Sequence, residues 1–386
     1  MPLSNKLIAL AVISFLLFFV ILVSIRGSFR GKINPPQTTP EQDLSTHPIY
    51  SKYQFNNTEN TINIGIQPLW TPTGFITEAL KRDDVLLNAL SELGKKIQFF
   101  SFLKGDDVNF FLTRKDIEVG IGGDMPAIRA AATLDVIIPA LIQQGFCSIV
   151  ANRHMLLREL RYEPIGFAFG SNAHYALLNA LKFEDIASNQ INLIPMDVTE
   201  MPYALHSGKI TAFSAWEPTP SISINKYSNH VVIHHSQSSG YLYFLKSFSD
   251  KNPEAVRQII AAEIRSIKWM QSDIKNLFKA SQWALTAGKS LSGSPIHLTV
   301  EQYANLAQKD IIGLDFEPII PIKNLKHKGP LHQEFNFLKS LGKISASKRW
   351  ENVRGSFDRI IIKEIIDNEK KYKINQFKYK VNKNEN

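Results

Sequence analysis

The chain contains a single cysteine, Cys147, among its 386 residues. One cysteine excludes a disulfide framework and any metal site built from several thiolates. Cys147 lies in the apolar run 142–150, where it is interpreted as buried filler. No cysteine follows the apolar N-terminal segment, so the lipid-attachment site that a lipoprotein needs is missing there.

Charged residues are absent from residues 7–25, a run of 19 positions interrupted only by two serines. This length matches the roughly 20 apolar residues that cross a bilayer as a helix. The run ends in Leu-Val-Ser-Ile-Arg without a small-residue cleavage site, so residues 1–25 predict an uncleaved anchor, with a cleaved signal as the alternative. Arg26, Arg30 and Lys32 follow the run, and the positive-inside rule would by itself place the rest of the chain in the cytoplasm.

Several catalytic and metal-binding motifs are also missing. Gly122-Gly123 is not followed by Gly-Lys-Ser/Thr, so it is not a phosphate loop. Ser171 and His174 lack a Gly-x-Ser-x-Gly elbow and an acidic partner, which argues against a catalytic pair. Three histidines lack the carboxylate or cysteine spacing of a metal site: His230, His234 and His235. We expect no enzymatic activity, no cofactor and no metal site.

From Thr61 onward, strand patterns alternate with helical ones. Ile62, Ile64 and Ile66 alternate as a strand, and residues 85–93 are expected to form a helix that ends at Gly94. A second unit of the same layout begins with a strand at 165–169 and continues into a helix whose apolar positions 173, 176, 177, 180 and 181 define one face. Further strands are expected at residues 97–103, 231–233 and 241–245, and a helix at about 273–287 that ends at Gly288. This order predicts an α/β fold with parallel-rich sheets covered by helices.

The two α/β units predict two lobes between which the chain crosses twice. Residues 61–150 and 236–345 are assigned to the first lobe, and residues 151–235 to the second. Residues 26–60 precede them and predict a flexible tether, because Pro, Thr, Gln, Asn and Ser are abundant there without periodicity.

Residues 346–386 are assigned to a basic C-terminal tail. From Arg359 to Asn386 the chain carries eight Lys or Arg against four acidic residues, a large share of its net charge of +9. The tail is interpreted as a solvated terminus, with contact to phosphates or anionic lipid as the alternative. Nothing else in the sequence indicates a nucleic-acid partner.

Polar and aromatic residues follow several predicted strands, at the position where open α/β sheets bind ligands. At the strand-to-helix junction 169–174, Gly170 permits close approach and the first N–H groups of the helix favour an anion, although plain capping by Ser171 is the alternative. Residues 122–126 form a second such turn. Trp216 offers an aromatic wall and Glu217 a carboxylate, while Gln67, Pro68 and Trp70 follow the first strand.

Six motifs, taken in order, resemble the substrate-binding proteins of nitrate, sulfonate and taurine ABC importers, a group also called the NMT1/THI5-like family. They are Ile64-Gly65-Ile66-Gln67-Pro68, Phe99-Phe100-Ser101-Phe102, Gly122 to Pro126, Gly170 to His174, Met196 to Pro202 and Ala215-Trp216-Glu217-Pro218. The resemblance runs from about Thr61 to about Trp283. It does not extend to the apolar N-terminal segment or to the region from Ala346 onward.

The resemblance implies a type II periplasmic-binding-protein fold, in which two lobes close over the ligand by a hinge motion. It assigns the anionic head of the ligand to Gly170, Ser171, Asn172 and His174, the facing wall to Asp124, Met125, Gln67 and Trp70, and the cover to Trp216 and Glu217.

The function that the resemblance implies is solute capture outside the cytoplasm, on the periplasmic face of the membrane, for an ABC importer of small anionic or zwitterionic compounds. Its partners would be the permease and ATPase subunits, with the membrane contacted through residues 7–25 and the binding lobes monomeric. A membrane-anchored ligand sensor is one alternative. A pyrimidine-synthase-like enzyme is another, but its expected cysteine-rich iron-binding segment and cytosolic N-terminus do not occur here.

Overall fold

The structure is a computed structural model that describes residues 43–311 and 318–380. The predicted anchor at residues 1–25 lies outside the described residues. None of the helices within the described ranges combines the length and apolar character that crossing a bilayer requires.

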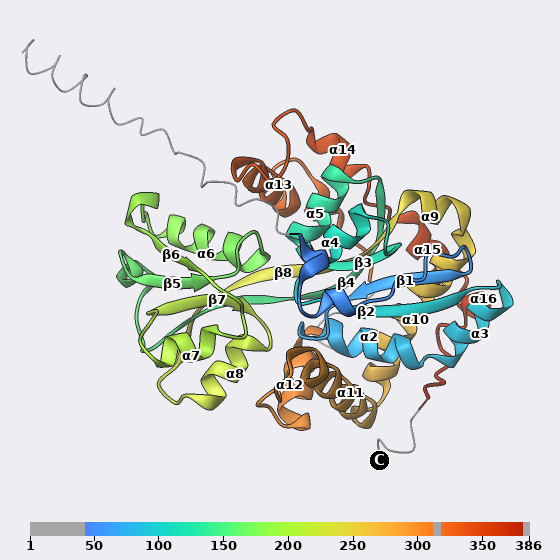
Figure 1. Ribbon diagram of the computed structural model, residues 1–386, viewed down its shortest axis with the longest axis horizontal. Helices are drawn as coiled ribbons and strands as arrows, with labels where there is room; N and C mark the ends of the chain where they lie inside the picture. Colours follow the sequence, from blue (N-terminus) through green and yellow to red (C-terminus); the bar gives the residue numbers. More distant parts are fainter. Residues whose placement is uncertain (1–42, 312–317, 381–386) are drawn as a thin grey trace, which may run out of the picture. The chain divides into compact units, whose positions relative to one another are not determined.

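One eight-stranded sheet, in the order β2-β1-β3-β8-β4-β7-β5-β6, organises the described residues. The strands are β1 (Thr61–Ile66), β2 (Lys96–Ser101), β3 (Val119–Gly123), β4 (Val136–Ala151), β5 (Pro164–Phe167), β6 (Asn192–Pro195), β7 (Ala212–Trp216) and β8 (Val231–Leu245). Strands β1, β2 and β3 are parallel, and so are β5, β6 and β7. The long strands β4 and β8 pair antiparallel with each other and join the two groups (Figure 1).

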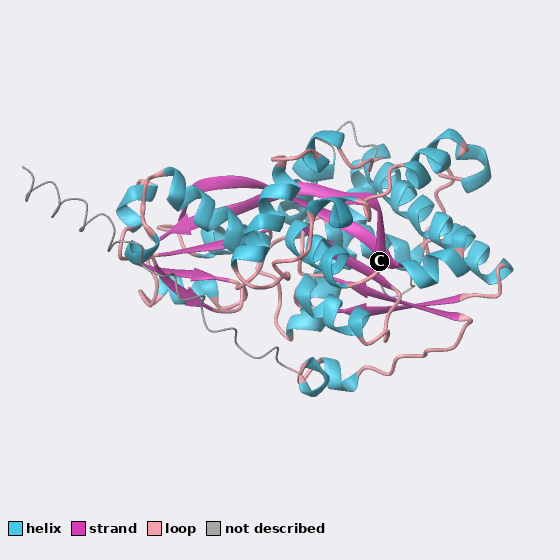
Figure 2. Cartoon of the chain, turned by 90° about the horizontal axis from the view of Figure 1, so that it is seen from above, coloured by secondary structure: helices cyan, strands magenta, loops and turns pink. Residues whose placement is uncertain are grey.

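We call β1, β2 and β3 with their covering helices the first half, and β5, β6 and β7 with theirs the second half. Helices lie on both sheet faces of each half (Figures 1 and 2). The α-helices are α2 (Thr73–Arg82), α3 (Asp84–Glu92), α4 (Gly105–Thr113), α5 (Asp124–Thr133), α6 (Asn172–Phe183), α7 (Met201–His206), α8 (Thr219–Lys226), α9 (Lys246–Lys251), α10 (Pro253–Ser272), α11 (Ile274–Ser292), α12 (Val300–Ile311), α13 (Pro330–Ser340), α14 (Trp350–Arg354), α15 (Ile360–Asp367) and α16 (Glu369–Tyr372). Short 3-10 helices are η1 (Leu44–Thr46), η2 (Tyr50–Lys52), η3 (Leu157–Leu160), η4 (Ser188–Gln190) and η5 (Ile322–Leu325).

Strand alternation divides the apolar core between the two faces of the sheet. In β4, Ile149 packs in the cluster that contains α6, while the next residue, Val150, packs in the cluster of α7. In β1, the three isoleucines of the predicted strand all enter the cluster beneath α2, α10 and α11. Successive side chains of a strand point to opposite faces, so each half buries two apolar layers.

The predicted alternation of strands and helices is confirmed, with some corrections at element boundaries. The helix predicted at 85–93 is α3, followed by Gly94 with φ +69°. The two strands predicted around 231 and 241 are one strand, β8. The helix predicted to end at Gly288 continues through Ser292 and ends at Gly293, whose φ of +71° favours glycine. Gly288 is a buried residue inside this helix. The lobe boundaries near residues 150 and 235 stay a prediction.

The described end of the predicted tether, from Asp43 onward, packs against the first half and is not free. Tyr50 is 1% exposed; its hydroxyl donates to Asp107 Oδ2 at 2.7 Å and accepts from the Leu103 amide at 2.9 Å. The predominantly polar composition of residues 26–60 did not indicate the Tyr50 contact, because a single aromatic residue changes the composition of such a segment very little.

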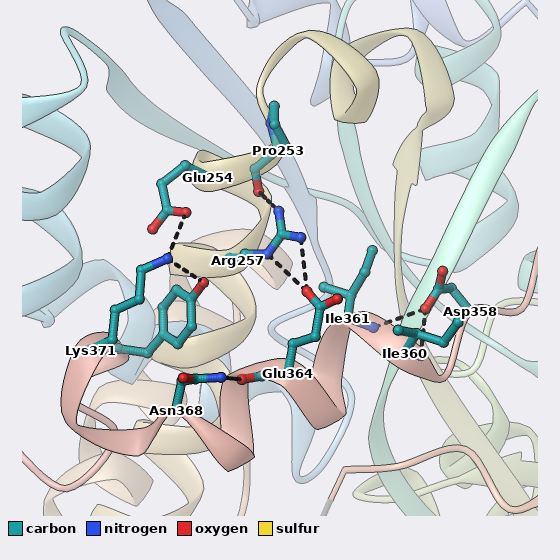
Figure 3. Close-up of polar contacts among 10 residues, drawn as sticks. Pro253, Glu254, Arg257, Asp358, Ile360, Ile361, Glu364, Asn368 and Lys371 are labelled. Carbon is teal, nitrogen blue, oxygen red and sulfur yellow. Dashed lines mark hydrogen bonds and ion pairs between the residues drawn. The ribbon is translucent and has the colours of Figure 1, made fainter.

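The predicted solvated tail is also a correction for the residues described. Helices α15 and α16 pack on α10, with Ile362 and Ile365 buried in the core of the first half. Figure 3 shows the polar border of this contact, where Arg257 Nη2 lies 2.9 Å from Glu364 Oε2 and Lys371 Nζ lies 3.6 Å from Glu254 Oε2. The basic residues of the tail form its outer surface, while its isoleucines hold it in place.

Candidate functional site

A cleft opens where strands from both halves end. It contains about 440 Å³ of space outside protein atoms, part of it continuous with solvent, and the residues that line it are Gln67, Trp70, Lys104, Gly105, Asp106, Gly123, Pro126, Phe169, Gly170, Ser171, Asn172, Trp216 and Ser238. These residues end or follow β1, β2, β3, β5 and β7, except Ser238, which belongs to β8. Binding sites of open α/β sheets form at such strand ends.

The start of α6 forms one wall of the cleft. Gly170 adopts φ +74°, a conformation that favours glycine, and the turn lets Ser171 cap the helix by accepting from the His174 amide at 3.2 Å. The Gly170 amide donates to His174 Nδ1 at 3.3 Å. Among the described residues, the structure gives no acceptor to the amides of Asn172 and Ala173. Asn172 lines the cleft, so its amide is available to an anion there, whereas Ala173 is buried and does not line it.

Asn172 connects the two halves across the floor of the cleft. Its Nδ2 donates to Ser238 Oγ at 2.6 Å and to Asp124 Oδ2 at 3.0 Å, and its Oδ1 accepts from the Met125 amide at 3.0 Å. Gly123 makes room for it, because a Cβ there would lie 2.5 Å from Asn172 Nδ2. The contact therefore ties the first turn of α6 to the first turn of α5.

Asp124 supports this floor from below and does not line the cleft. It is 4% exposed, and its Oδ2 also accepts from the Ser239 amide at 2.7 Å. Burial raises the pKa of its carboxyl to about 7, although the hydrogen bonds that it accepts act in the opposite direction.

Two charged residues that follow β2, Lys104 and Asp106, line the cleft although no sequence motif predicted them as site residues. Asp106 Oδ2 lies 2.9 Å from Arg129 Nη1 and 3.5 Å from the position of a Cβ on Gly170, so this carboxylate stands beside the start of α6. Burial raises its pKa to about 6. Lys104 also lines the cleft, and Lys343 Nζ lies 5.2 Å above the Phe169 ring.

Charged side chains of both signs lie at this side of the cleft. Lys104, Arg129 and Lys343 gather around Asp106 and the neighbouring Asp107, whose carboxylate also accepts from Tyr50. Carboxylates balance these cations, because Asp197 also acts on Asp107. The unpaired Asn172 amide at the start of α6 is therefore the group that favours a negatively charged ligand.

Aromatic and apolar side chains form the remaining walls. Trp70 is 6% exposed, and its ring packs so closely on Gly240 that a Cβ there would lie 2.6 Å from Trp70 Cη2. Trp216, Phe169 and Pro126 line the cleft from other sides. These surfaces suit a short hydrocarbon group attached to the anion.

Six of the ten predicted site residues line the cleft: Gln67, Trp70, Gly170, Ser171, Asn172 and Trp216. Gln67 is held by donation from its Nε2 to the Ile121 carbonyl at 2.7 Å. Met125 is buried in the apolar core and contributes only its amide, to Asn172. Glu217 does not line the cleft, and its Oε2 accepts from the Ser221 amide at 3.2 Å.

His174 was predicted to contact the ligand, but it is buried and does not line the cleft. Its side chain is 3% exposed and lies between the rings of Phe167, Phe169 and Phe337, at centroid distances of 4.5, 5.4 and 5.4 Å. Burial lowers its pKa to about 4, so the imidazole is neutral at pH 7. Its role in the structure is to hold the Gly170 turn.

Comparisons with known proteins agree with this architecture, although no protein-family model matches the chain. The "Putative aliphatic sulfonates-binding protein" of Bacillus subtilis (strain 168) is 24% identical over 238 residues, which cover 56% of this chain and 70% of that protein.

Two solved structures share the fold. The periplasmic aliphatic sulphonate binding protein SsuA from Escherichia coli superimposes with a TM-score of 0.58 at 16% identity, covering 76% of this chain and 92% of that one. The alkanesulfonate-binding protein SsuA from Xanthomonas axonopodis pv. citri, bound to MOPS, gives a TM-score of 0.58 at 16% identity and covers 79% and 100%. All three are solute-binding proteins and not enzymes, in agreement with the expectation of a chain without catalysis. The described chain has the α/β fold of the periplasmic binding proteins, and its resemblance to the sulfonate-binding proteins of ABC importers is confirmed.

Proposed function

We propose that this chain is the solute-binding subunit of an ABC importer for small organic sulfonates, acting outside the cytoplasm. The observation that carries the proposal is the start of α6, where Asn172, whose amide has no acceptor, lines a cleft between two α/β halves. The names of the related proteins supply the ligand class. Permease and ATPase subunits are the partners that such a protein requires, and residues 7–25 are proposed as its membrane anchor.

In this proposal a sulfonate oxygen accepts from the Asn172 amide, with Lys104 adding a positive charge. Charge-assisted hydrogen bonds of this kind are about twice as strong as neutral ones. The hydrocarbon part of the ligand lies against Trp70 and Trp216. Nitrate would satisfy the amide but leave both indole rings without a contact, so an organic sulfonate fits the cleft better.

An amine on the ligand, as in taurine, would meet Asp106 and not Glu217. Asp106 lines the cleft beside the start of α6, whereas the Glu217 carboxylate accepts from the Ser221 amide. Ligand capture would draw the halves together through bending of β4 and β8, the two strands that join them.

Ligand binding to the purified full chain tests the proposal. MOPS, taurine, ethanesulfonate and nitrate are titrated while the melting temperature is followed, since binding at a hundredfold excess over Kd stabilises by about 2.7 kcal/mol. We expect saturable stabilisation by at least one sulfonate. Trp216→Ala should weaken that binding about tenfold or more, because an indole wall is lost.

Tyr203→Ala is the matched control, since Tyr203 is an aromatic residue of α7 that is 68% exposed and does not line the cleft. It should leave sulfonate binding unchanged. Failure of all sulfonates to stabilise the chain, or equal binding by the Trp216 variant, would overturn the proposed function.

A further inference from the structure

A second cavity lies on the other side of Asn172. It is bounded by α6, α13 and β8, and it contains about 950 Å³ of space outside protein atoms, part of it continuous with solvent. Figure 1 shows α13 above the sheet, between α6 and α5. Phe337 of α13 contacts Tyr175 of α6 at a ring distance of 5.1 Å, so the cavity is closed by elements from both halves and from the C-terminal part of the chain.

The wall of this cavity is polar and acidic. Asp124 and Glu334 contribute carboxyl groups, and Asn179, Gln237 and Gln333 contribute amides. None of the described residues that line it is Lys, Arg or His. Two carboxyl groups in one cavity without a basic partner require a positive charge from elsewhere when they ionise.

Glu334 provides the independent indication of a ligand. The residue is 7% exposed, it lines the cavity, and its Oε2 is buried without a hydrogen-bond partner. The buried Tyr241 side chain lies close by, and Asp124 and Glu334 are the charged groups that act on it. A buried acceptor without a donor destabilises the fold, and more so when it carries a charge. Such an atom in a residue that lines a polar cavity indicates a missing donor.

We propose that this cavity is a second ligand site, which binds a small organic amine by its ammonium group between Glu334 and Asp124. The ammonium group donates three hydrogen bonds and supplies the counter-charge that the wall lacks. The amides of Asn179, Gln237 and Gln333 then offer hydrogen bonds to hydroxyl or amine groups elsewhere on the molecule. This inference does not rest on the proposed function of the cleft.

An organic amine fits better than a bare metal ion. The described residues contain no group of three or more His, Cys, Asp or Glu side chains that could hold a metal. The wall also offers amide groups beside its two carboxyl groups, which suits a molecule with more polar groups than one ion.

The protonation of the empty site agrees with this inference. Burial and the neighbouring Asp124 raise the pKa of Glu334 well above its ordinary value, and burial raises the pKa of Asp124 to about 7. Without an amine, the carboxyl groups of Asp124 and Glu334 tend to keep their protons, and a bound ammonium group would take the place of these protons. Binding of an amine should release protons to the solution.

Calorimetric titration of the purified full chain with 1,4-diaminobutane and with ethanolamine tests the site. We expect saturable binding of at least one amine, with a heat that changes with the ionisation enthalpy of the buffer because protons are released. Glu334→Gln keeps the size of the side chain and removes its charge. It should weaken amine binding at least tenfold while leaving sulfonate binding unchanged.

Trp216→Ala is the reciprocal control, which should weaken sulfonate binding and leave amine binding unchanged. Absence of saturable amine binding by the unchanged chain, or equal binding by the Glu334 variant, overturns the site. A separate titration uses calcium chloride. If calcium binds, Glu334→Gln abolishes that binding and no amine binds, the amine proposal is wrong and the cavity is a metal site. Each of these results leaves the sulfonate measurement readable by itself.

Discussion

The two cavities on either side of Asn172 have opposite character. The cleft has tryptophan walls, an unpaired helix amide and a lysine beside one aspartate, whereas the cavity beneath α13 has two carboxyl groups, several amides and no basic residue in its described wall. One asparagine side chain separates them and belongs to both linings. A single contact between the halves can therefore set the geometry of two chemically different sites.

The two cavities differ in character because different parts of the strands and helices line them. The cleft receives the loops at strand ends, where backbone amides are unpaired and glycines allow close approach. The cavity beneath α13 is lined from α6, α13 and β8. Its two carboxyl groups and its amide side chains give it an acidic and polar character.

Asn172→Ala should have the largest effect, because it removes the shared wall. The Met125 amide loses its acceptor and Asp124 Oδ2 loses one of its donors, so we expect the free energy of unfolding to fall by about 2 kcal/mol. Sulfonate affinity should fall about tenfold or more, because α6 is no longer held against α5. Urea unfolding and thermal-shift titration measure the two effects.

Asn179→Ala is the control, since Asn179 is an exposed asparagine on the same helix that does not line the cleft. It should retain wild-type stability to within about 0.5 kcal/mol, as surface substitutions usually do, and unchanged sulfonate binding. Equal stability of the two variants would show that the Asn172 contact does not join the halves.

Asp106→Asn should have a smaller effect that is specific to the cleft. Asp106 is proposed to receive the amine of an aminosulfonate, so its neutralisation should reduce the affinity for taurine relative to ethanesulfonate, which lacks the amine, by about tenfold. Ethanesulfonate itself should bind as well or better, because a negative charge leaves the cleft. The ratio of the two dissociation constants is the measurement.

Asp250→Asn serves as the control, because Asp250 pairs with Lys246 on the exposed surface of α9. An unchanged taurine-to-ethanesulfonate ratio in Asp106→Asn would remove Asp106 from amine recognition. The sulfonate site at the start of α6 would remain.

Much of the cleft was predictable because strand ends carry recognisable turns. Gly170 and Ser171 show the junction through glycine and a capping serine, and Trp216 follows a clear strand. Lys104 and Asp106 follow the predicted strand 97–103 in the same way, but no motif marks them. Their relation to the ligand site becomes visible only in the folded chain, where the start of α6 lies beside Asp106.

The errors have equally local causes. His174 was assigned to the ligand, yet it stands three residues before Leu177 and seven before Leu181, on the apolar face of α6, and this spacing indicates burial. The C-terminal tail was judged by its charge, while Ile362 and Ile365 form the buried stripe of α15. The cavity beneath α13 could not be predicted, because α6 and α13 are more than a hundred residues apart in the sequence.

The smallest expected effect concerns pH and the cavity beneath α13. Burial raises the folded-state pKa of Asp124 to about 7, against an ordinary value near 3.8 for an unfolded chain. The folded chain therefore binds this proton more tightly, and the contribution of Asp124 to stability is fully present below about pH 4 and is lost as pH rises through about 7. Asp124→Asn is neutral at every pH and should remove this dependence.

Melting temperatures of the unchanged chain and of Asp124→Asn, measured from pH 5 to pH 8, provide the test. The unchanged chain should lose at least about 2 °C more than the variant over this range. His174, with its pKa lowered to about 4, acts in the opposite direction, but both chains contain it and its effect cancels in the difference. Burial and the Asp124 charge both raise the pKa of Glu334, so part of the difference in melting temperature arises from Glu334. Parallel pH profiles of the two chains would contradict both the interaction of the two carboxyl groups and the burial of Asp124.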